Sequence, residues 1–568
     1  MLNFITQINE SQTYDAIVVG SGISGGWAAK EFCEKGFKTL VLERGRMVRH
    51  VTDYPTMNHE HWDFEHRGRL TYEDNRKYHI QARSGFINEA NKHFHINDIE
   101  NPYTEIKRFD WIRGDQVGGR SLLWGKQCYR WSDLDFEANA KEGIGVDWPI
   151  RYKDIENWYT YVEKYVGISG EKLGLAHLPD GHFLPPMELN CIEKHVKTRI
   201  EKEFKERYLT IGRVAHLTEP INGRGKCQYR NRCSRGCPFG AYFSSNAVTL
   251  PAADATGNLT IRPDSAVHSI IYDAKTGKAT GVRTVDTVTH ETTEFFARVI
   301  FLNASTLGST AILLNSTSDR FPNGMGNDSG ELGHNLMDHH YRLGAMGSYE
   351  GFEDQYYKGR RPNGIYIPRF RNLNGQTKHP DFLRGYGYQG GGSRGNWGGG
   401  VNKEGMGADF KENLFQPGGW GMTLVGFGEC LPYHENKVTL NHDLKDKAGL
   451  PTLAFDCEFK TNEMSMRKQI KDDAAEMLEK AGLKNVTTFD RMGAIGVGIH
   501  EMGTARMGKD PKTSVLNAQN QVHAVPNVFV TDGACMTSSS CVNPSITYMA
   551  LTARAVDFAV QEIKANRL

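Results

Sequence analysis

A glycine-rich turn between two apolar strands near the start of the chain constrains the fold more than any other feature. An apolar run over residues 14–19 is followed by Gly20, Gly22 and Gly25. Gly20 permits a tight turn, Gly22 lets the backbone approach a pyrophosphate, and Gly25 lets the next helix pack closely on the strand. The spacing therefore predicts a strand–helix–strand unit that holds a dinucleotide.

Glu43 closes the second apolar strand of this unit. A carboxylate at this point accepts hydrogen bonds from a ribose hydroxyl and repels a 2′-phosphate. The alternative is an ordinary glycine turn, but strand, helix, second strand and acid in register argue against it. We expect an ADP moiety without a 2′-phosphate.

Length and charge restrict the class of protein. At 568 residues the chain exceeds the size of one core, so we expect two interleaved domains. Lys plus Arg number 68 against 67 acidic residues with no basic run, which argues against a nucleic-acid partner. No apolar stretch approaches the ~18 residues of a membrane span, and no Lys or Arg precedes Lys30. We therefore expect a soluble chain with no transmembrane segment and no export leader of its own.

Two turns near the C-terminus carry the chemistry. His500 opens a glycine-bounded turn, Asp532-Gly533 follows a strand, and Asn543 precedes a final helix. Oxidising an alcohol by hydride transfer needs a base at the hydroxyl proton, and a neutral imidazole suits that task. We expect His500 to be this base and Asn543 to orient the same oxygen. A purely structural histidine is the alternative.

These motifs, taken in order, resemble the glucose-methanol-choline (GMC) oxidoreductase family over nearly the whole chain. The resemblance implies a Rossmann-like FAD-binding domain with an interleaved α+β substrate domain on an antiparallel sheet, and alcohol oxidation by a His–Asn pair. The motifs that carry it are the fingerprint at Gly20, Gly118-Gly119, Gly308-Ser309, residues 335–339, and His500 with Asn543, 43 positions apart.

The same resemblance implies the FAD contacts and the domain boundaries. It places FAD-binding parts at 1–166, 246–342 and 491–568, a cysteine loop with a substrate-domain segment at 167–245, and the substrate domain at 343–490. Val267 would approach the adenine through its backbone. The implied cofactor residues are Gly20, Gly22, Gly25, Glu43, Gly118, Gly119, Ser121, Val267, Asp532, Gly533, Asn543 and Ser545.

Cys227, Cys233 and Cys237 form a compact C-x5-C-x3-C array that could bring three thiolates to one metal centre. The array resembles that of the catalytic subunits of bacterial FAD-dependent glucose and fructose dehydrogenases, which implies a 3Fe-4S cluster. The alternatives are zinc with His216 as a fourth ligand, or one disulfide and a spare thiol. A metal site at the histidines around Asp338 is less favoured than a structural role beside the flavin domain.

A glycine-rich segment follows the middle of the chain. Nine of the sixteen residues from Gly385 to Gly400 are glycine, with Tyr386, Tyr388 and Trp397 between them. We expect a loop, a bulged sheet edge or a lid whose aromatic rings stack on a sugar, because exposed aromatics are otherwise costly.

The opening motif and the cysteine array together resemble bacterial glucoside 3-dehydrogenases. The resemblance implies an FAD-dependent dehydrogenase that oxidises a secondary hydroxyl of a sugar or glycoside, best C3 of a glucoside. A reduced flavin can discharge single electrons through iron to a cytochrome c. A small subunit with a twin-arginine leader would carry the chain to the periplasm; without it the chain would stay cytoplasmic. The alternatives are an oxidase with a structural cysteine loop and a lyase with non-redox FAD.

Overall fold

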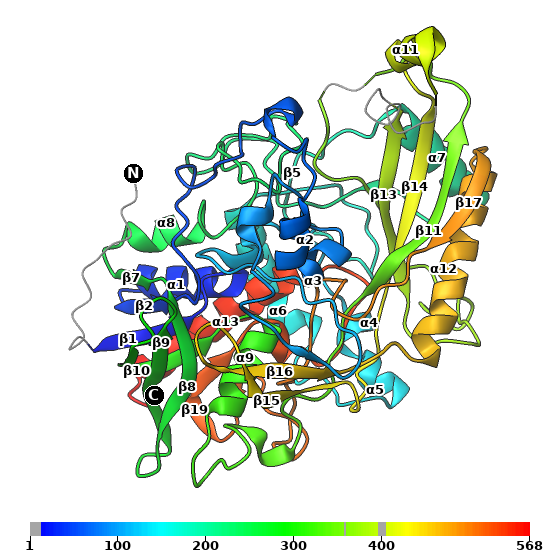
Figure 1. Cartoon of the computed structure of the whole chain (residues 1–568). Helices are drawn as coiled ribbons and strands as arrows, with labels where there is room; N and C mark the ends of the chain where they lie inside the picture. Colours follow the sequence, from blue (N-terminus) through cyan, green and yellow to red (C-terminus); the bar gives the residue numbers. More distant parts are fainter. Residues whose placement is uncertain (1–12, 357–358, 396–404) are drawn as a thin grey trace.

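The computed structural model describes residues 13–356, 359–395 and 405–568. Figure 1 shows a sheet with its helices at one end and an antiparallel sheet at the other, with long loops between them. The predicted fold class, α/β with an interleaved antiparallel domain, is confirmed. The domain boundaries stay a prediction.

The first sheet has eight strands, and its middle five are parallel. They are β1 (Tyr14–Val19), β2 (Thr39–Leu42), β7 (Leu259–Arg262), β8 (Ser265–Asp273), β9 (Lys278–Asp286), β10 (Thr292–Leu302), β18 (Gln521–Val522) and β19 (Val525–Val530). The order is β18-β19-β10-β1-β2-β7, and β8 and β9 extend the first half of β10. Strands buried on both faces require continuous apolar runs, which explains the runs visible in the sequence.

The helix of the predicted strand–helix–strand unit packs against two other helices. Helix α1 (Ile23–Glu34) follows the glycine turn and packs on the final helix α13 (Ser545–Lys564) and on α8 (Thr249–Asp254). This contact brings the start of α13, and with it the residues just before it, toward the glycine turn.

The second sheet has six antiparallel strands in the order β17-β11-β14-β13-β12-β6. They are β6 (Thr210–Ile211), β11 (His340–Tyr349), β12 (Ile365–Ile367), β13 (Tyr386–Arg394), β14 (Trp420–Gly428) and β17 (Lys484–Asp490). Helix α12 (Thr461–Lys480) packs on β11, β14 and β17, and helix α7 (Cys191–Glu203) packs on β13 and β14.

The glycine-rich segment corrects one expectation. Residues 386–394 form an interior strand, and Tyr386 and Tyr388 are fully buried, so the sugar-stacking role is wrong for both. The Tyr388 hydroxyl donates to the Ile470 carbonyl at 2.7 Å. Gly392 allows α7 to pack closely, because a Cβ there would lie 2.2 Å from the Ile192 side chain, and a Cβ at Gly390 would lie 2.0 Å from the Thr423 carbonyl oxygen of β14. Trp397 lies outside the described residues.

The remaining elements lie outside the two large sheets. Residues 48–101 contain only short helices. The smaller elements are β3 (Thr104–Glu105), β4 (Ile168–Ser169), β5 (Phe183–Leu184), β15 (Lys437–Lys445), β16 (Pro451–Asp456), α2 (Tyr72–Lys77), α3 (His79–Arg83), α4 (Asp133–Phe136), α5 (Ala138–Glu142), α6 (Tyr152–Val166), α9 (Thr306–Asn315) and α11 (Gly407–Phe415).

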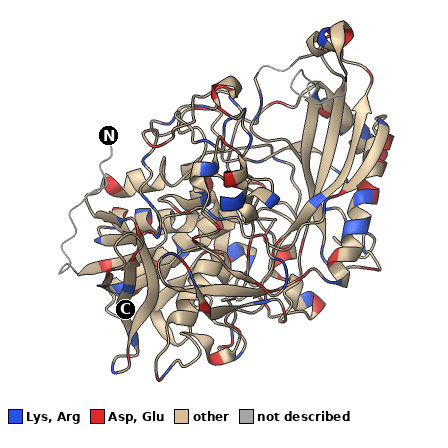
Figure 2. Cartoon of the chain, in the orientation of Figure 1, with Lys and Arg blue, Asp and Glu red and all other residues tan. Residues whose placement is uncertain are grey.

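Charged residues of both signs are interspersed along the chain, as Figure 2 shows. Within the three described ranges, no helix has the combined length and apolarity that crossing a bilayer requires.

Candidate active site

One cavity of about 530 Å³ joins the glycine turn to the C-terminal pair. The chain segments that reach it come from both ends of the sequence and from the loops between the two sheets. The predicted cofactor and catalytic residues that line it are Gly20, Gly22, Glu43, Gly119, Ser121, Val267, His500, Asp532, Gly533, Asn543 and Ser545.

The three fingerprint glycines have the geometry that their roles require. Gly20 has φ +92°, and a Cβ there would lie 2.4 Å from the Asn303 carbonyl oxygen. A Cβ at Gly25 would lie 1.8 Å from the Gly20 oxygen, so the helix can approach the strand only without one. A Cβ at Gly22 would meet nothing within 4 Å. Gly22 therefore presents bare backbone to the cavity, while Gly25 lies behind its wall.

Glu43 is anchored by the glycine turn. Its carboxylate accepts the backbone N–H groups of Ser21 and Gly45, both at 3.1 Å, and the Ser21 hydroxyl at 2.5 Å. Burial raises the pKa of Glu43 to about 7. The Gly118 N–H donates to the Ser21 hydroxyl at 2.8 Å, so Gly118 of the second glycine block supports the first glycine turn without lining the cavity itself.

His500 and Asn543 meet at the other end of the cavity. His500 Nε2 lies 3.2 Å from Asn543 Nδ2. The Asp338 carboxylate positions the turn, because it accepts the backbone N–H groups of Gly496 and Gly498 at 2.8 Å and of His500 at 3.0 Å. Burial, together with the neighbouring His339 and Arg120, holds the pKa of His500 well below its ordinary value. The imidazole is therefore neutral and able to accept a proton.

Sequence reasoning missed two groups beside this pair. The structure places His339 Nδ1 2.7 Å from His500 Nδ1, and Gln389 Nε2 donates to Asn543 Oδ1 at 2.7 Å. The sequence predicted only a structural role for His339 beside the flavin domain. Its position directly after Asp338 in a family motif could have pointed to the site. The contact with His500 spans 161 residues, however, and leaves no local pattern.

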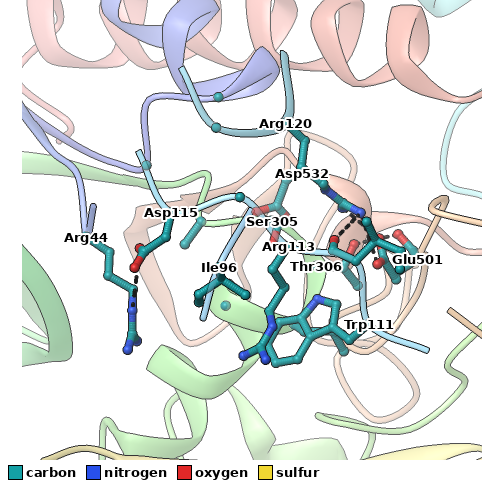
Figure 3. A pocket seen from close by; sticks show the side chains of 18 of the residues that line it. Arg44, Ile96, Trp111, Arg113, Asp115, Arg120, Ser305, Thr306, Glu501 and Asp532 are labelled. Carbon is teal, nitrogen blue, oxygen red and sulfur yellow. Dashed lines mark hydrogen bonds and ion pairs between the residues drawn. The ribbon is translucent and has the colours of Figure 1, made fainter. Parts of the chain in front are cut away.

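An ion pair connects the second glycine block to the turn that carries His500. Arg120 points toward Glu501 across one wall of the cavity (Figure 3). Nearby, the Ser309 hydroxyl donates to Asp532 at 2.6 Å. Burial raises the pKa of Asp532 to about 6.

The cavity also contains buried polar atoms without a protein partner. Asn303 Oδ1 and the Tyr548 hydroxyl are both in this state, and both residues line the cavity. Buried polar groups ordinarily have partners. Together with the bare backbone at Gly22, these atoms fit a large polar cofactor such as FAD.

The cysteine array forms a second, smaller cavity. Cys227, Cys233 and Cys237 line it together with His216, whose Nε2 lies 3.6 Å from Cys233 Sγ. The three cysteines are free thiols, and burial raises the pKa of Cys227 to about 11. Across the part of the chain that the structure describes, no group of three or more His, Cys, Asp or Glu side chains is arranged to hold a metal ion. The arrangement thus does not support the predicted cluster.

Comparison with known proteins identifies the family. Two family profiles described as GMC oxidoreductase match residues 14–341 and 432–552. The chain belongs to the GMC oxidoreductase family. Like other GMC oxidoreductases, it is an FAD-dependent enzyme that oxidises CH–OH groups of alcohols or sugars.

Relatives of this GMC oxidoreductase cover it almost end to end. It is 27% identical to the 2-methyl-1,2-propanediol dehydrogenase of Mycolicibacterium austroafricanum, over 96% of this chain and 94% of the relative. It is 24% identical to the fructose dehydrogenase large subunit of Gluconobacter japonicus, over 98% and 99%. The structure of pyridoxine 4-oxidase from Mesorbium loti has a TM-score of 0.58 and 16% identity, covering 96% of this chain and 99% of that one.

Proposed function

We propose that this GMC oxidoreductase is a dehydrogenase that oxidises a secondary hydroxyl of a sugar or glycoside, with C3 of a glucoside as the preferred position. The observation that carries the proposal is the neutral His500 beside Asn543, on the wall of the cavity that the glycine turn also lines. The name of the fructose dehydrogenase relative supports a sugar as substrate.

The chain's own groups prepare the hydroxyl for oxidation. His500 Nε2 takes the hydroxyl proton, and the Asn543 amide donates to the same oxygen and orients it. Bound FAD would supply the two-electron acceptor that oxidation of the CH–OH group to C=O requires. Asp532, Gly533 and Ser545 would contact the cofactor at this end of the cavity, and Glu43 at the adenosine end.

Anaerobic mixing of the holoenzyme with methyl β-D-glucopyranoside tests the proposal. We expect bleaching of the oxidised flavin spectrum and a 3-keto product by NMR. His500→Ala should retain flavin and reduce it more slowly by about 10²–10⁴-fold. His442→Ala, an exposed histidine on β15, is the matched control. Absence of flavin reduction with every glucoside tested would overturn the substrate assignment.

Two alternatives predict different results in the same assay. An oxidase would release hydrogen peroxide stoichiometrically with product when oxygen is admitted. A lyase would convert substrate while its flavin stayed oxidised without oxygen.

We also propose that Cys227, Cys233 and Cys237 hold an iron–sulfur cluster in the mature enzyme and that a cytochrome c is the final electron acceptor. In support, the three thiols share one cavity, and the adjacent Ser234 lines the cofactor cavity. Lys126 lines the cofactor cavity too and donates to the Cys233 carbonyl at 3.0 Å.

Iron and acid-labile sulfide analysis of anaerobically purified protein decides this second proposal. We expect about three irons per FAD if the cluster is of the 3Fe-4S type. Cys233→Ser should lose the iron and the reduction of cytochrome c, but keep the reduction of flavin by sugar. Iron-free protein that still reduces cytochrome c would contradict it.

The proposed localisation is the periplasm, reached by export together with a small subunit that carries the leader. The relative named as a large subunit supports a partner of this kind. Fractionation of cells that express the chain with and without such a subunit tests the proposal, and equal export in both would overturn it.

A further inference from the structure

Five groups form a continuous line of hydrogen-bonding contacts through the active site. His339 Nε2 contacts the Ser540 carbonyl oxygen, and His339 Nδ1 lies 2.7 Å from His500 Nδ1. His500 Nε2 lies 3.2 Å from Asn543 Nδ2, and Gln389 Nε2 lies 2.7 Å from Asn543 Oδ1. Each ring or amide in the line must donate at one end and accept at the other.

The Ser540 carbonyl sets the direction of the line, because a backbone carbonyl can only accept. His339 Nε2 must therefore carry a hydrogen. Burial lowers the pKa of His339 to about 4, and its side chain is fully buried, so the ring is neutral. A neutral imidazole with hydrogen on Nε2 has a lone pair on Nδ1.

That lone pair determines the tautomer of His500. Two ring nitrogens 2.7 Å apart need a hydrogen between them, and His339 Nδ1 has none to give. The hydrogen must then belong to His500 Nδ1, which leaves the lone pair on His500 Nε2. In the substrate-free site the Asn543 amide nitrogen donates to that lone pair, a contact that the substrate hydroxyl would replace, and Asn543 Oδ1 accepts from Gln389.

The opposite direction fails at the Ser540 end. If His500 carried its hydrogen on Nε2, then His339 would have to donate from Nδ1. Its Nε2 lone pair would then face the lone pairs of the Ser540 carbonyl in a buried site. A buried carbonyl left without a donor and facing a nitrogen lone pair is strongly disfavoured.

We propose that His339 is a positioning residue that holds His500 in the Nδ1–H tautomer, with its basic Nε2 toward the substrate hydroxyl. The inference rests on the proposed role of His500 as the base. Gln389 has the matching task for Asn543, because it holds the amide with its nitrogen toward His500. His339 thus orients the catalytic imidazole as a carboxylate does in a Ser-His-Asp triad, but without a negative charge.

Two substitutions of similar size separate this role from simple packing. His339→Asn places an amide oxygen near the Nδ1 position, where it can accept from His500, but it loses the contact with Ser540. His339→Gln reaches the Ser540 carbonyl from the Nε2 position but offers His500 no acceptor. We expect flavin reduction within about tenfold of wild type for His339→Asn and about 100-fold slower for His339→Gln, at the lower end of what general-base help contributes.

A structural role predicts the reverse order, since His339→Gln keeps the bond that anchors the side chain. Anaerobic stopped-flow reduction with methyl β-D-glucopyranoside gives the rate and the substrate dissociation constant separately. We expect the loss in the rate alone. Equal rates for wild type and His339→Gln, with His500→Ala inactive, would overturn the positioning role and leave the proposed function intact.

A second measurement needs no substrate. In the ¹⁵N-histidine-labelled holoenzyme, the His500 resonances are assigned by their absence in His500→Ala. We expect a protonated Nδ1 and a bare Nε2 in wild type and in His339→Asn, and a mixture of tautomers in His339→Gln. A protonated Nε2 on wild-type His500 would overturn the inference, even if no glucoside reduces the flavin and the proposed function fails.

Discussion

Arg120 and Glu501 form a two-point ion pair, with Nη1–Oε1 at 3.1 Å and Nη2–Oε2 at 2.7 Å. The Glu501 side chain is almost completely buried, and Arg120 is its ion-pair partner. Arg120 belongs to the second glycine block, whereas Glu501 directly follows His500. The pair therefore ties the turn that carries His500, the proposed base, to the loop that lines the cavity.

Removing the Arg120 side chain alone should lower the free energy of unfolding. Arg120→Met leaves a buried carboxylate unpaired, which we expect to destabilise the fold by about 3 kcal/mol. The double variant Arg120→Met with Glu501→Gln should recover much of that loss, because no charge is left unpaired. Thermal unfolding of the four proteins in the cycle measures the coupling. Additive losses of stability in the two single variants would show that Arg120 and Glu501 do not stabilise the fold as a pair.

Two neighbouring glycines should fail in different ways when replaced by alanine. Gly25→Ala places a Cβ 1.8 Å from the Gly20 oxygen, so we expect a lower unfolding temperature. Gly22→Ala meets nothing within 4 Å, so the apoprotein should fold normally. Its added methyl should obstruct the cofactor and weaken FAD binding by about tenfold or more, since 1.4 kcal/mol is one decade. Thermal melts and FAD titrations distinguish them, and normal FAD binding by Gly22→Ala would be evidence against this cofactor pose.

The apoprotein should lose stability as the pH rises through neutrality. Burial raises the pKa of Glu43 from an ordinary value of 4.5 to about 7. The folded state therefore binds a proton that the unfolded state releases, so this contribution is complete below about pH 4.5 and is lost as the pH rises through 7. The shift corresponds to about 3 kcal/mol. Between pH 5 and 8, the unfolding temperature of the Glu43→Gln apoprotein should change less with pH than that of wild type. An unchanged pH dependence would show that another group is responsible.

Asp338 should be essential for the shape of the catalytic turn. Its carboxylate accepts four backbone N–H groups, those of His339, Gly496, Gly498 and His500. Asp338→Asn would direct an amide N–H₂ group at two of these donors. We expect a cost of about 1–3 kcal/mol for each buried donor left unpaired, with slower flavin reduction and faster hydrogen exchange over residues 496–500.

The matched control for this variant is Asp328→Asn. Asp328 forms an exposed pair with Arg320 at 2.6 Å, a kind of contact that contributes about 0–1 kcal/mol. It should leave both readouts unchanged. Unaltered exchange over residues 496–500 in Asp338→Asn would mean that the turn is held by other contacts.

The elements that the sequence predicted well are those with a strong local pattern. The strand–helix–strand unit at the start depends on apolar periodicity and glycine spacing, and it was placed to within a few residues. These patterns are local, so a single sequence contains them.

The errors and omissions depend on long-range packing. The glycines of β13 suggested an irregular segment, because the sequence cannot show that α7 presses on the strand where side chains are missing. Nor could it show that Tyr386 and Tyr388 face the core beneath α12. The His339–His500 contact joins segments 161 residues apart, and only the fold brings them together. The catalytic and cofactor roles assigned to individual residues stay predictions.

The residues of the proposed catalytic centre come from two separate packing layers of the fold. Gln389 lies on β13 and His339 directly precedes β11, both in the antiparallel sheet, whereas Asn543 leads into α13, which packs against the glycine-turn helix. A slip of a fraction of an ångström between these layers would separate the amide pair while each layer kept its own hydrogen bonds. On heating, the enzyme should therefore lose activity before it releases FAD and before it unfolds.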